Sequence, residues 1–593
     1  MLSVLTCSVS AQTASITDVY PDKARYSLHE SIQIRAEIRG PVHTGDLLSA
    51  KVMDLGEQVG SCGPVALTAH TPSTLLIPCS VPAIDFRGYL VTVELKSSGG
   101  RVLDHRITAL DVSSDWKRFP RYGYLAHWNA GEGARPAEWI DELNRFHIDG
   151  LEFYDFQYRH DQPLAGSISR PASTWKDIAG REVDASIVNG FIQEAHAHNM
   201  MAMAYNASYS AYDDVFTRQN PLPLQWGTWT TADGPRTLQT AKSLSFNGTS
   251  WSTSKLFYMN QNDAGWQSYI FGQMQNLFEV YPFDGWHIDT FGEKSAYAFD
   301  RSEVDYIAGF KPYIDHASSM LKKPILFNAV NTFGQDRIAN SAAEFVYSEL
   351  WEDHETFASI MGTAEQVHIA NPAKAYVVAA YLHRYEGKEH IQPQTGVFNI
   401  PSVLLTDATI FSSGAAHIEL GDGDRMLSNE YFPADTRFTV SPKLRCELRH
   451  YYDFLTAYEV YLRDGLTPSP IAVSIEGIPV DPLGVPNTVW SISRQKDDMI
   501  MVHLINLRGS DDPHWRDISM SRPDAPRLHD LNVKFSLAKP VTSIGWASPD
   551  SDGGRYHSLE FHEHTRGQSI EIGVTIPELH YWDTLFIHTA HER

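Results

Sequence analysis

The chain has 593 residues, and its 72 acidic and 48 basic residues give it a net charge of −24. Hydrophobic residues make up 42% of the sequence, which excludes a disordered or fibrous protein and is enough for a large core. The negative charge argues against nucleic acid, anionic membranes and polyanionic substrates as partners. Because no run of about 18 apolar residues occurs, the sequence also predicts no transmembrane helix.

Residues 1–12 resemble the end of a signal peptide. A short apolar stretch ends in Ser-Val-Ser-Ala before Gln12, as at an A-x-A-like cleavage site, although a basic segment ahead of it is missing. We interpret this segment as the remnant of an export signal. The sequence therefore predicts a secreted or periplasmic protein.

Residues 13–117 show the pattern of an all-β region. Segments such as 31–38 and 89–96 alternate apolar and polar residues, and turn residues separate them. This pattern predicts an N-terminal immunoglobulin-like β-sandwich. Cys62 and Cys79 lie in it. They either form a disulfide in an oxidising compartment or stay unpaired on neighbouring strands, and the sequence leaves both possibilities open.

The pattern changes in residues 118–467, where short apolar runs alternate with long helical stretches. Eight such repeats predict a central (β/α)8 TIM barrel as the catalytic domain. A doubly wound sheet is the rival, but no Gly-rich phosphate turn supports it. The expected strands are 121–128, 149–156, 200–208, 284–292, 324–330, 344–351, 375–382 and 415–422.

Helical periodicity and a return to short strands complete the expected architecture. In residues 468–593 short alternating strands recur, which predicts a C-terminal antiparallel β-sandwich. The expected helices are 137–147, 184–199, 266–281, 302–322, 354–371 and 443–465.

Ionisable residues stand at the expected carboxyl ends of several barrel strands, where barrel active sites lie. Side chains alternate along a strand, so His287 and Asp289 share one face of the fourth strand, and Tyr347 and Glu349 share one face of the sixth. Further candidates at strand ends are Tyr154, Asp155, His417, Glu419 and Asp422.

Two carboxyl groups that face one cleft are the minimum apparatus of glycoside hydrolysis. One must be ionised to attack the anomeric carbon or activate water, and the other must keep its proton to protonate the leaving oxygen. Burial and the charge of the first group raise the pKa of the second. Asp289 and Glu349, on two strands of one barrel, are the pair that the sequence favours.

A metal site is the competing chemistry, because His287, Asp289, Glu349 and His417 could converge on one ion. No HExxH and no Cys/His spacing supports it. The sequence also lacks a G-x-S-x-G elbow and the Walker and dinucleotide motifs. We therefore expect a reaction that needs no metal and no organic cofactor, and the sequence leaves a structural calcium undecided.

At these residues the chain resembles glycoside hydrolase family 66, which contains endo-dextranases and cycloisomaltooligosaccharide glucanotransferases. The similarity spans roughly residues 120–465, and several motifs in order carry it. They are FYDFQYRHDQPLAG (153–166), TWKDIAGREV (174–183), MAYNASYSAY (203–212), FDGWHIDTFGEK (283–294), VYSELWED (346–353), VVAAYLHRYEG (377–387), FNIPSVLLTDATIFSSGAAHIELGDGDRMLSNEYFP (398–433) and RHYYDFLTAYEVYLRD (449–464).

The resemblance implies roles for individual residues. It makes Asp289 the nucleophile, Glu349 the general acid/base, and Asp155 a third essential carboxylate near the sugar bound at subsite −1. Trp128, Trp351 and Tyr381 are candidate platforms on which sugar rings stack. By the same analogy, the residues expected to contact sugar hydroxyls are Tyr154, His160, Asn206, His287, Asn328, Glu419 and Asp422.

The resemblance also implies a secreted endo-dextranase that hydrolyses α-1,6-glucosidic bonds of dextran to isomaltooligosaccharides with retention. The alternative is a cycloisomaltooligosaccharide glucanotransferase. Cyclising members often carry a carbohydrate-binding module inserted in the barrel, whereas the 383–414 segment here is only about 30 residues long. A non-catalytic glucan-binding protein is a third hypothesis, against which the three intact carboxylates argue.

Overall fold

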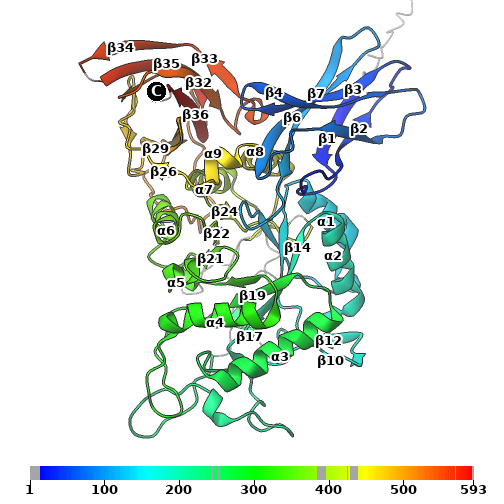
Figure 1. The fold of residues 1–593 in the computed structure, drawn as a ribbon, viewed down its shortest axis with the longest axis vertical. Coiled ribbons are helices and arrows are strands. Elements are labelled where there is room, and N and C mark those ends of the chain that lie inside the picture. The colour runs from blue at the N-terminus through cyan, green and yellow to red at the C-terminus, as the bar shows by residue number, and fades with distance from the viewer. Residues whose placement is uncertain are drawn as a thin grey trace, which may run out of the picture.

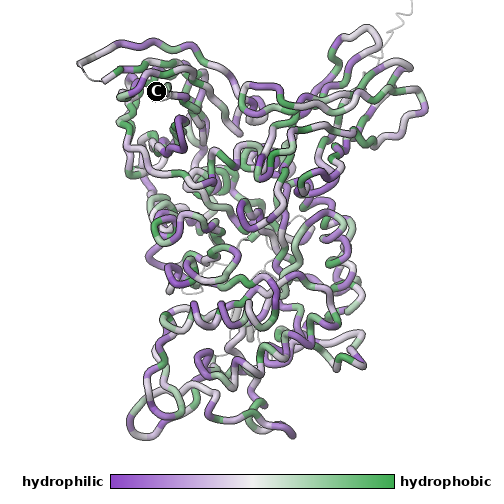
Figure 2. The backbone as a smooth tube through the Cα atoms, in the orientation of Figure 1, coloured by the Kyte–Doolittle hydropathy of each residue, from purple (hydrophilic) through white to green (hydrophobic). Residues whose placement is uncertain are grey.

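The computed structural model describes residues 14–241, 245–246, 249–250, 254–383, 396–423, 425–427, 438–567 and 569–590, so the expected export-signal remnant lies outside it. The N-terminal strands (blue) and the C-terminal strands (orange to red) lie side by side at one end of the molecule, and a parallel α/β region extends away from them (Figure 1). Along these N-terminal and C-terminal strands, hydrophobic and hydrophilic residues alternate (Figure 2). Among the described helices, none has the length and apolar character that crossing a membrane requires.

The N-terminal strands form one continuous antiparallel sheet in the order β1-β2-β5-β4-β3-β6-β7. Its edges meet, because Tyr26 bridges Val112 and the Ile16 amide donates to Asp104 Oδ2 at 2.9 Å. The sheet is barrel-like, so the prediction of a two-sheet sandwich is wrong here; both architectures produce the same alternation. The strands are β1 (Ser15–Pro21), β2 (Ile32–Arg39), β3 (Leu47–Asp54), β4 (Glu57–Ala66), β5 (Thr74–Ser80), β6 (Arg87–Lys96) and β7 (Val102–Val112), and a disulfide joins Cys62 to Cys79.

All eight strands expected in the central region are present and parallel. They form a five-stranded sheet, β20-β19-β14-β9-β8, and a three-stranded sheet, β21-β22-β24. Asn328 bridges Tyr347 between β20 and β21, and the Tyr124 amide donates to Leu420 O at 3.1 Å, so the sheets are linked at both ends. The strands are β8 (Tyr122–Leu125), β9 (Gly150–Phe153), β14 (Met201–Ala207), β19 (Gly285–Asp289), β20 (Ile325–Phe327), β21 (Val346–Glu349), β22 (Tyr376–Ala379) and β24 (Ala416–His417).

Alternate residues of these strands pack on opposite faces. One set, including Tyr122, Met203 and Tyr347, packs together into a single apolar cluster, and we call this the inner face. The other set, including Phe153 and Trp286, packs against the helices, and we call this the outer face. The period of two fixes which residues of each strand point toward the inner cluster.

Helices follow each parallel strand, including two that the sequence patterns do not predict. Helix α7 lies within the segment expected to join the last two strands. Asn399 is its N-cap, and the Asn399 side chain accepts a hydrogen bond from the Ser402 amide. All its faces are buried, so it has no amphipathic signature. The helices are α1 (Pro136–Asn144), α2 (Ala185–Ala197), α3 (Ala264–Val280), α4 (Tyr306–Leu321), α5 (Gln335–Ala339), α6 (Phe357–Ala370), α7 (Ile400–Ser412), α8 (Pro442–Ala457) and α9 (Glu459–Arg463).

Short two-stranded antiparallel or parallel sheets lie in the connecting segments of the parallel region. Two of them, β10–β11 and β12–β13, lie in the segment between β9 and α2. The pairs are β10 (Gly166–Ser167) with β11 (Arg170–Pro171), β12 (Thr174–Lys176) with β13 (Glu182–Asp184), β15 (Ser210–Tyr212) with β18 (Leu256–Tyr258), β16 (Ser245–Phe246) with β17 (Thr249–Ser250), and β23 (Gly396–Val397) with β25 (Phe438–Thr439).

The C-terminal part contains two mainly antiparallel sheets that share one apolar core, as a sandwich predicts. The first has the order β26-β29-β30-β36-β32-β33 with β28 beside β29, and the second has the order β27-β31-β35-β34. The strands are β26 (Thr467–Pro468), β27 (Ser474–Ile475), β28 (Val480–Asp481), β29 (Val489–Lys496), β30 (Met499–Asn506), β31 (Leu528–Leu537), β32 (Val541–Ala547), β33 (His557–Leu559), β34 (Phe561–Arg566), β35 (Ser569–Leu579) and β36 (Trp582–Thr589).

Candidate active site

Asp289, the last residue of β19, is on the inner face and is held by three donors. Its Oδ2 accepts a hydrogen bond from the Tyr205 hydroxyl at 2.7 Å. Its Oδ1 accepts one from Asn328 Nδ2 and one from the Thr290 amide, both at 2.8 Å. Burial raises the pKa of Asp289, and the three donors oppose that rise because they favour the ionised form. The three donors thus fix the carboxylate in position and favour its ionised form against the effect of burial.

Glu349, the last residue of β21, is also buried among donors, but it has the negative charge of Asp289 beside it. Burial and the negative charge of Asp289 raise its pKa to about 7, although donors oppose the rise. The nearest of these is the Tyr381 hydroxyl, which donates to Glu349 Oε1 at 2.6 Å, and Trp351 Nε1 donates to Oε2 at 3.4 Å. At slightly acidic pH this carboxyl group therefore carries a proton while Asp289 is placed among donors.

Asn328 connects the two carboxyl groups. It follows β20, the strand between those that end in Asp289 and Glu349, so its amide lies between them. Its side-chain hydrogen bonds favour the ionised form of both groups. Its own position is fixed, because its backbone amide donates to Ile288 O at 2.9 Å and its carbonyl accepts from Thr290 Oγ1 at 2.9 Å.

Asp155 supplies a third carboxyl group, just beyond β9. Its backbone has a φ of 49°, in the left-handed region that Asp tolerates better than most residues. Gln157 Nε2 donates to Oδ1 at 3.2 Å, and Oδ2 is buried without a hydrogen-bond partner among the described residues. Burial and the neighbouring Asp177 raise the pKa of Asp155 to about 7, against the opposing charge of Arg181. This is a buried acceptor with unused capacity.

Glu152 is an acidic residue of the site that the sequence patterns miss. It is on the inner face of β9, and burial together with the charges of Asp289, Glu349 and Asp155 raises its pKa well above the usual value. Its Oε2 lies 3.6 Å from His287 Nδ1, and burial lowers the pKa of that imidazole to about 3. Burial therefore favours the neutral form of both groups, which limits the charge beneath the catalytic pair.

Tyr205 is the second site residue that is absent from the sequence-based candidates. Alternation along β14 nevertheless places it on the inner face. Met203 and Tyr205 share the inner face, which leaves Asn206 on the other side. Asn206 Nδ2 donates to His160 O at 2.7 Å, so this amide braces the loop after β9. The prediction of Asn206 as a sugar contact is therefore wrong, and its neighbour faces Asp289 instead.

Two predicted sugar contacts border the carboxyl groups from the β9 side. The ring of Tyr154 lies 4.5 Å from that of Tyr205, which holds Asp289. His160 Nδ1 accepts from the Ala207 amide at 3.2 Å, which assigns its proton to Nε2, and burial lowers its pKa to about 3. His160 is therefore a neutral imidazole with an N–H to donate.

The predicted aromatic platforms have three different environments. Trp351 is partly exposed, and its ring stacks on Tyr381 with centroids 4.7 Å apart and an interplanar angle of 15°. Tyr381 is buried, and its hydroxyl is committed to Glu349. Trp128 is only 2% exposed and stacks on Phe153 on the outer face. The prediction of Trp128 as a platform is wrong, because this indole packs in the wall; of the three, only Trp351 offers an exposed ring.

His287 is also displaced from its predicted role. It is 1% exposed on the inner face, and its ring packs against Tyr347 with centroids 4.7 Å apart. Tyr122 OH lies 3.0 Å from its Nδ1. The imidazole therefore lies in the packed layer beneath Asp289, where it supports the carboxylates and does not reach a sugar hydroxyl.

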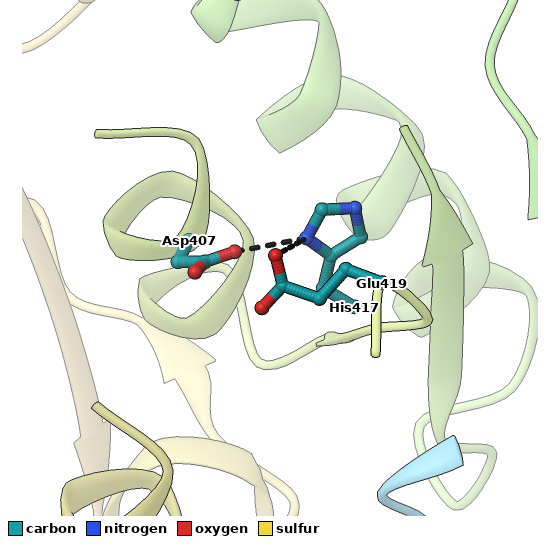
Figure 3. A group of neighbouring side chains, drawn as sticks. All are labelled: Asp407, His417 and Glu419. Carbon is teal, nitrogen blue, oxygen red and sulfur yellow. Dashed lines mark hydrogen bonds and ion pairs between the residues drawn. The ribbon is translucent and has the colours of Figure 1, made fainter. Parts of the chain in front are cut away.

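Glu419 and His417 point away from the other site residues. Ala416 and Ile418 are on the inner face, so alternation directs His417 and Glu419 to the outer face. Figure 3 shows Asp407, on helix α7, and Glu419 both directed at His417, whose Nδ1 lies 2.8 Å from Asp407 Oδ1 and 3.5 Å from Glu419 Oε2. The prediction of Glu419 as a sugar contact is wrong, and the placement of His417 also removes the basis of the alternative in which it shares a metal ion with Asp289.

This buried cluster is the one group of His, Cys, Asp or Glu in the described chain whose ligand atoms are close enough to hold a metal ion. Burial raises the pKa of Asp407 and of Glu419 well above their usual values and lowers that of His417. A protonated carboxyl group can then donate to its neighbour, so the three groups can satisfy one another. Tyr452 OH adds a donor to Glu419 Oε1 at 3.0 Å.

Asp422 is hydrogen-bonded at the end of the first strand. Its Oδ2 lies 2.7 Å from His127 Nδ1, and the Ala126 amide donates to the same oxygen at 3.3 Å. Burial raises its pKa, but the hydrogen bond and charge of His127 and the charge of Arg425 outweigh burial and lower it. Asp422 is therefore ionised, and His127, which the sequence patterns miss, is its partner.

Arg516 brings the C-terminal part into the site. It lies between β30 and β31 and is buried, and its guanidinium donates to Tyr381 O at 2.9 Å and to Leu350 O at 3.0 Å. These carbonyls belong to the residue that donates to Glu349 and to the residue that follows Glu349. Arg516 Nε also pairs with Glu355 at 3.1 Å.

Replacing Arg516 by methionine is expected to lower kcat about tenfold with little change in KM, because the strand ends that hold Glu349 lose a shared anchor. The two buried carbonyls would lose their donor, at a cost of about 1–3 kcal/mol each in the free energy of unfolding. Steady-state kinetics and thermal unfolding check both effects. Arg527→Met, at an exposed position of the same segment, is the control. Unchanged kcat with a lowered Tm would show that Arg516 is only structural.

The Tyr381 hydroxyl is expected to set the alkaline limb of the pH profile. Activity requires protonated Glu349, so kcat/KM falls as pH rises through the pKa of about 7. Tyr381 donates to the ionised form and lowers this pKa, so Tyr381→Phe moves the limb upward by about one pH unit. The measurement is kcat/KM against pH, with Tyr376→Phe, at the start of β22, as control. A limb that moves downward would contradict the assignment.

A neutral acid and a stabilised carboxylate, placed at the carboxyl ends of parallel strands and joined by one amide, define a glycoside hydrolase. A model of glycosyl hydrolase family 66 matches residues 21–586, and the chain belongs to that family.

Named relatives and a solved structure agree with this assignment. The chain is 26% identical over 727 residues to a cycloisomaltooligosaccharide glucanotransferase of Niallia circulans, covering 98% of this chain and 72% of that protein. It is 24% identical over 585 residues to a dextranase of Streptococcus salivarius, covering 84% of this chain and 67% of that protein. A crystal structure of a Paenibacillus sp. cycloisomaltooligosaccharide glucanotransferase complexed with cycloisomaltoheptaose has a TM-score of 0.87 at 23% identity, covering 97% and 100% of the two chains, and shares the fold.

Proposed function

We propose that this protein is a retaining endo-dextranase that cleaves α-1,6-glucosidic bonds of dextran and releases isomaltooligosaccharides. The observation that carries the proposal is the pairing of Asp289, held by three donors, with Glu349, whose pKa is raised to about 7 by burial and by the charge of Asp289. A retaining glycosidase needs these two states side by side. The names of the relatives support α-1,6-glucans as the substrate class.

In the first step Asp289 attacks the anomeric carbon and Glu349 gives its proton to the departing O6. In the second step Glu349 takes a proton from water, which attacks the glycosyl-enzyme and releases Asp289 with overall retention. Retention requires the two carboxyl groups to be about 5–5.5 Å apart. Tyr205 and Asn328 donate to Asp289, so they hold the nucleophile in line and stabilise it again when it leaves.

Asp155 is the proposed partner of the sugar at subsite −1. Its unpartnered Oδ2 can accept a hydrogen bond from a ring hydroxyl, and that bond strengthens as positive charge develops at the anomeric carbon. Tyr154 and His160 border the same side and supply a hydroxyl and an N–H. No step in this mechanism needs a metal ion or an organic cofactor.

Cyclisation of the glucan is the second candidate, and the names of the relatives favour it. The match to the Niallia circulans transferase extends over 727 residues, more than the 593 of this chain, so that relative carries residues that have no counterpart here. A chain without such an insertion supports hydrolysis as the main reaction. The chemistry of the first step is common to both.

Product analysis distinguishes the candidates. Purified protein is incubated with dextran, and products are separated by chromatography with mass detection over a time course. Linear isomaltooligosaccharides, each heavier by one water than the corresponding ring, support the endo-dextranase. Products lighter by one water mean that the chain's own end is the acceptor, and cyclisation replaces hydrolysis. No product, with dextran still retarding the protein in an affinity gel, means a glucan-binding protein.

The architecture and cellular location are part of the same proposal. We treat residues 118–467 as a (β/α)8 barrel, since contacts link its two parallel sheets at both ends, and residues 13–117 and 468–593 as flanking domains. We also propose that the protein is exported. The Cys62–Cys79 disulfide supports an oxidising compartment such as the periplasm or the extracellular space.

A further inference from the structure

A pocket lies on the flank of the parallel region, apart from the candidate active site. It has a volume of about 880 Å³ and is bounded by the β10–β11 pair, residues 218–222 and helix α3. This volume lies within the range of roughly 300–1,000 Å³ that ligand pockets have.

Side-chain amides supply much of the polar lining. Five of them border the pocket, and no carboxylate occurs among its described lining residues, although the whole chain carries a net charge of −24. Amides both donate and accept, so they match the paired hydroxyls of a sugar and give no preference to an ion. The five are Gln162, Gln219, Asn220, Gln273 and Asn276.

Helix α3 presents one polar face to this pocket. Tyr269, Gln273 and Asn276 are spaced four and three residues apart, so they follow one another along the same face. Apolar surface accompanies the amides, since Tyr269 contributes a ring and Ile168, at the tip of the β10–β11 pair, is 45% exposed. Sugar rings have apolar faces and polar edges, and this lining offers both kinds of surface.

Arg218 is the single cationic residue among the described lining residues, and a buried carboxylate pairs with it. Arg218 Nη1 pairs with Asp161 Oδ2 at 2.7 Å, and Arg218 Nη2 donates to Tyr269 OH at 3.1 Å. Asp161 is fully buried, and its Oδ1 accepts from the Tyr212 amide at 3.1 Å. The Arg218 charge is therefore paired within the floor of the pocket, which suits a neutral ligand.

The pocket is separate from the carboxyl groups of the candidate active site. Helix α3 begins at Ala264, after the loops that follow β14, and ends at Val280, just before β19 starts. It therefore runs from the carboxyl edge of the strands toward their amino edge. Residues along its pocket-lining face therefore lead away from Asp289, which is at the carboxyl end of β19.

We propose that this pocket is a second, non-catalytic binding site for a neutral α-1,6-glucan chain. The identity of the ligand rests on the proposed function, whereas the neutral polyhydroxyl character follows from the lining. A chain held at both sites binds with an effective concentration gain that a short oligosaccharide cannot have. The pocket therefore raises affinity for long dextran and leaves the chemistry at Asp289 unchanged.

The test uses the full chain with Gln273→Ala and Asn276→Ala combined. Gln275→Ala is the matched control, because Gln275 is exposed on the same helix and does not line the pocket. In an Asp289→Asn background, native gels containing dextran measure binding without hydrolysis. In the active protein, kcat/KM is measured on high-molecular-mass dextran and on an aryl α-isomaltotrioside.

The pocket variant is expected to bind dextran about five- to tenfold more weakly, as for the loss of one or two hydrogen bonds. Its kcat/KM on dextran falls to a similar extent, and that on the aryl trioside and all values for Gln275→Ala stay unchanged. Equal retardation of all variants, with the parent still hydrolysing dextran, overturns the second site alone. A parent that neither binds nor hydrolyses dextran overturns the glucan ligand and the proposed function together.

Discussion

Asp289→Gly is expected to lower turnover of dextran by about 10⁴-fold or more, because the reaction loses the group that forms the covalent intermediate. The substitution also leaves space beside Tyr205 and Asn328, which donate to the carboxylate in the native protein. A small anion such as azide can occupy that space and attack the anomeric carbon directly. With an aryl α-isomaltotrioside, added azide should therefore restore turnover and give a β-configured glycosyl azide, since only one displacement occurs.

Nuclear magnetic resonance of the isolated product determines this configuration. Asp284→Gly, a nearby acidic position at the amino end of the same strand, provides a control for general loss of folding, and circular dichroism checks both variants. Azide should not change the turnover of the native protein in this way. An α-configured azide, or activity that survives the substitution, would mean that another group is the nucleophile.

The arrangement of Asp289 and Glu349 could be predicted from the sequence, because their position at a strand end and the alternation of side chains along the strand indicate the same site. Each lies at the end of a short apolar run, and alternation places each on the same face as an aromatic or imidazole ring two residues earlier. The structure confirms both placements on the inner face. The same rule, applied to β9 and β14, identifies Glu152 and Tyr205, so these residues were within reach of the sequence.

Other residues show where that reasoning fails. Glu419 and Asn206 are polar residues near strand ends, but polarity does not reveal the face, and their inner neighbours are apolar or aromatic. His287 is on the correct face, but depth along the strand decides whether a side chain meets solvent or the packed layer beneath. Trp128 packs against Phe153 on the outer face. Its residue type did not reveal this, because a large aromatic ring suits a core as well as a sugar-binding surface.

Long-range contacts could not be predicted from local patterns at all. Arg516 reaches Leu350 O and Tyr381 O from a segment far away in the chain, and nothing in its own neighbourhood marks it. Helix α7 is missed because full burial removes its amphipathic period. The N-terminal strands are recognised, but whether their sheet closes on itself depends on contacts such as Tyr26 with Val112 that alternation does not encode.

Glu349→Ala is expected to lower turnover of dextran by about 10³-fold or more, since the departing O6 of a sugar leaves poorly without a proton. An aryl α-isomaltotrioside with an acidic phenol needs little protonation, so its first step should be much less affected. The second step stays slow because no base activates water. The variant should therefore release one equivalent of phenol in a burst and then turn over slowly, a sequence that stopped-flow absorbance resolves.

Azide tests this variant in a way that complements the first. It needs no base, so it should accelerate the second step of Glu349→Ala and attack the glycosyl-enzyme on Asp289. Two displacements then occur, and the glycosyl azide should have the α configuration. Opposite configurations from the two variants assign the nucleophile and the acid/base independently. The alkaline limb near pH 7, which arises from burial of Glu349 and the charge of Asp289, should disappear with the Glu349 carboxyl group. If that limb persists unchanged in Glu349→Ala, another group supplies the proton, and the paired roles proposed here do not hold.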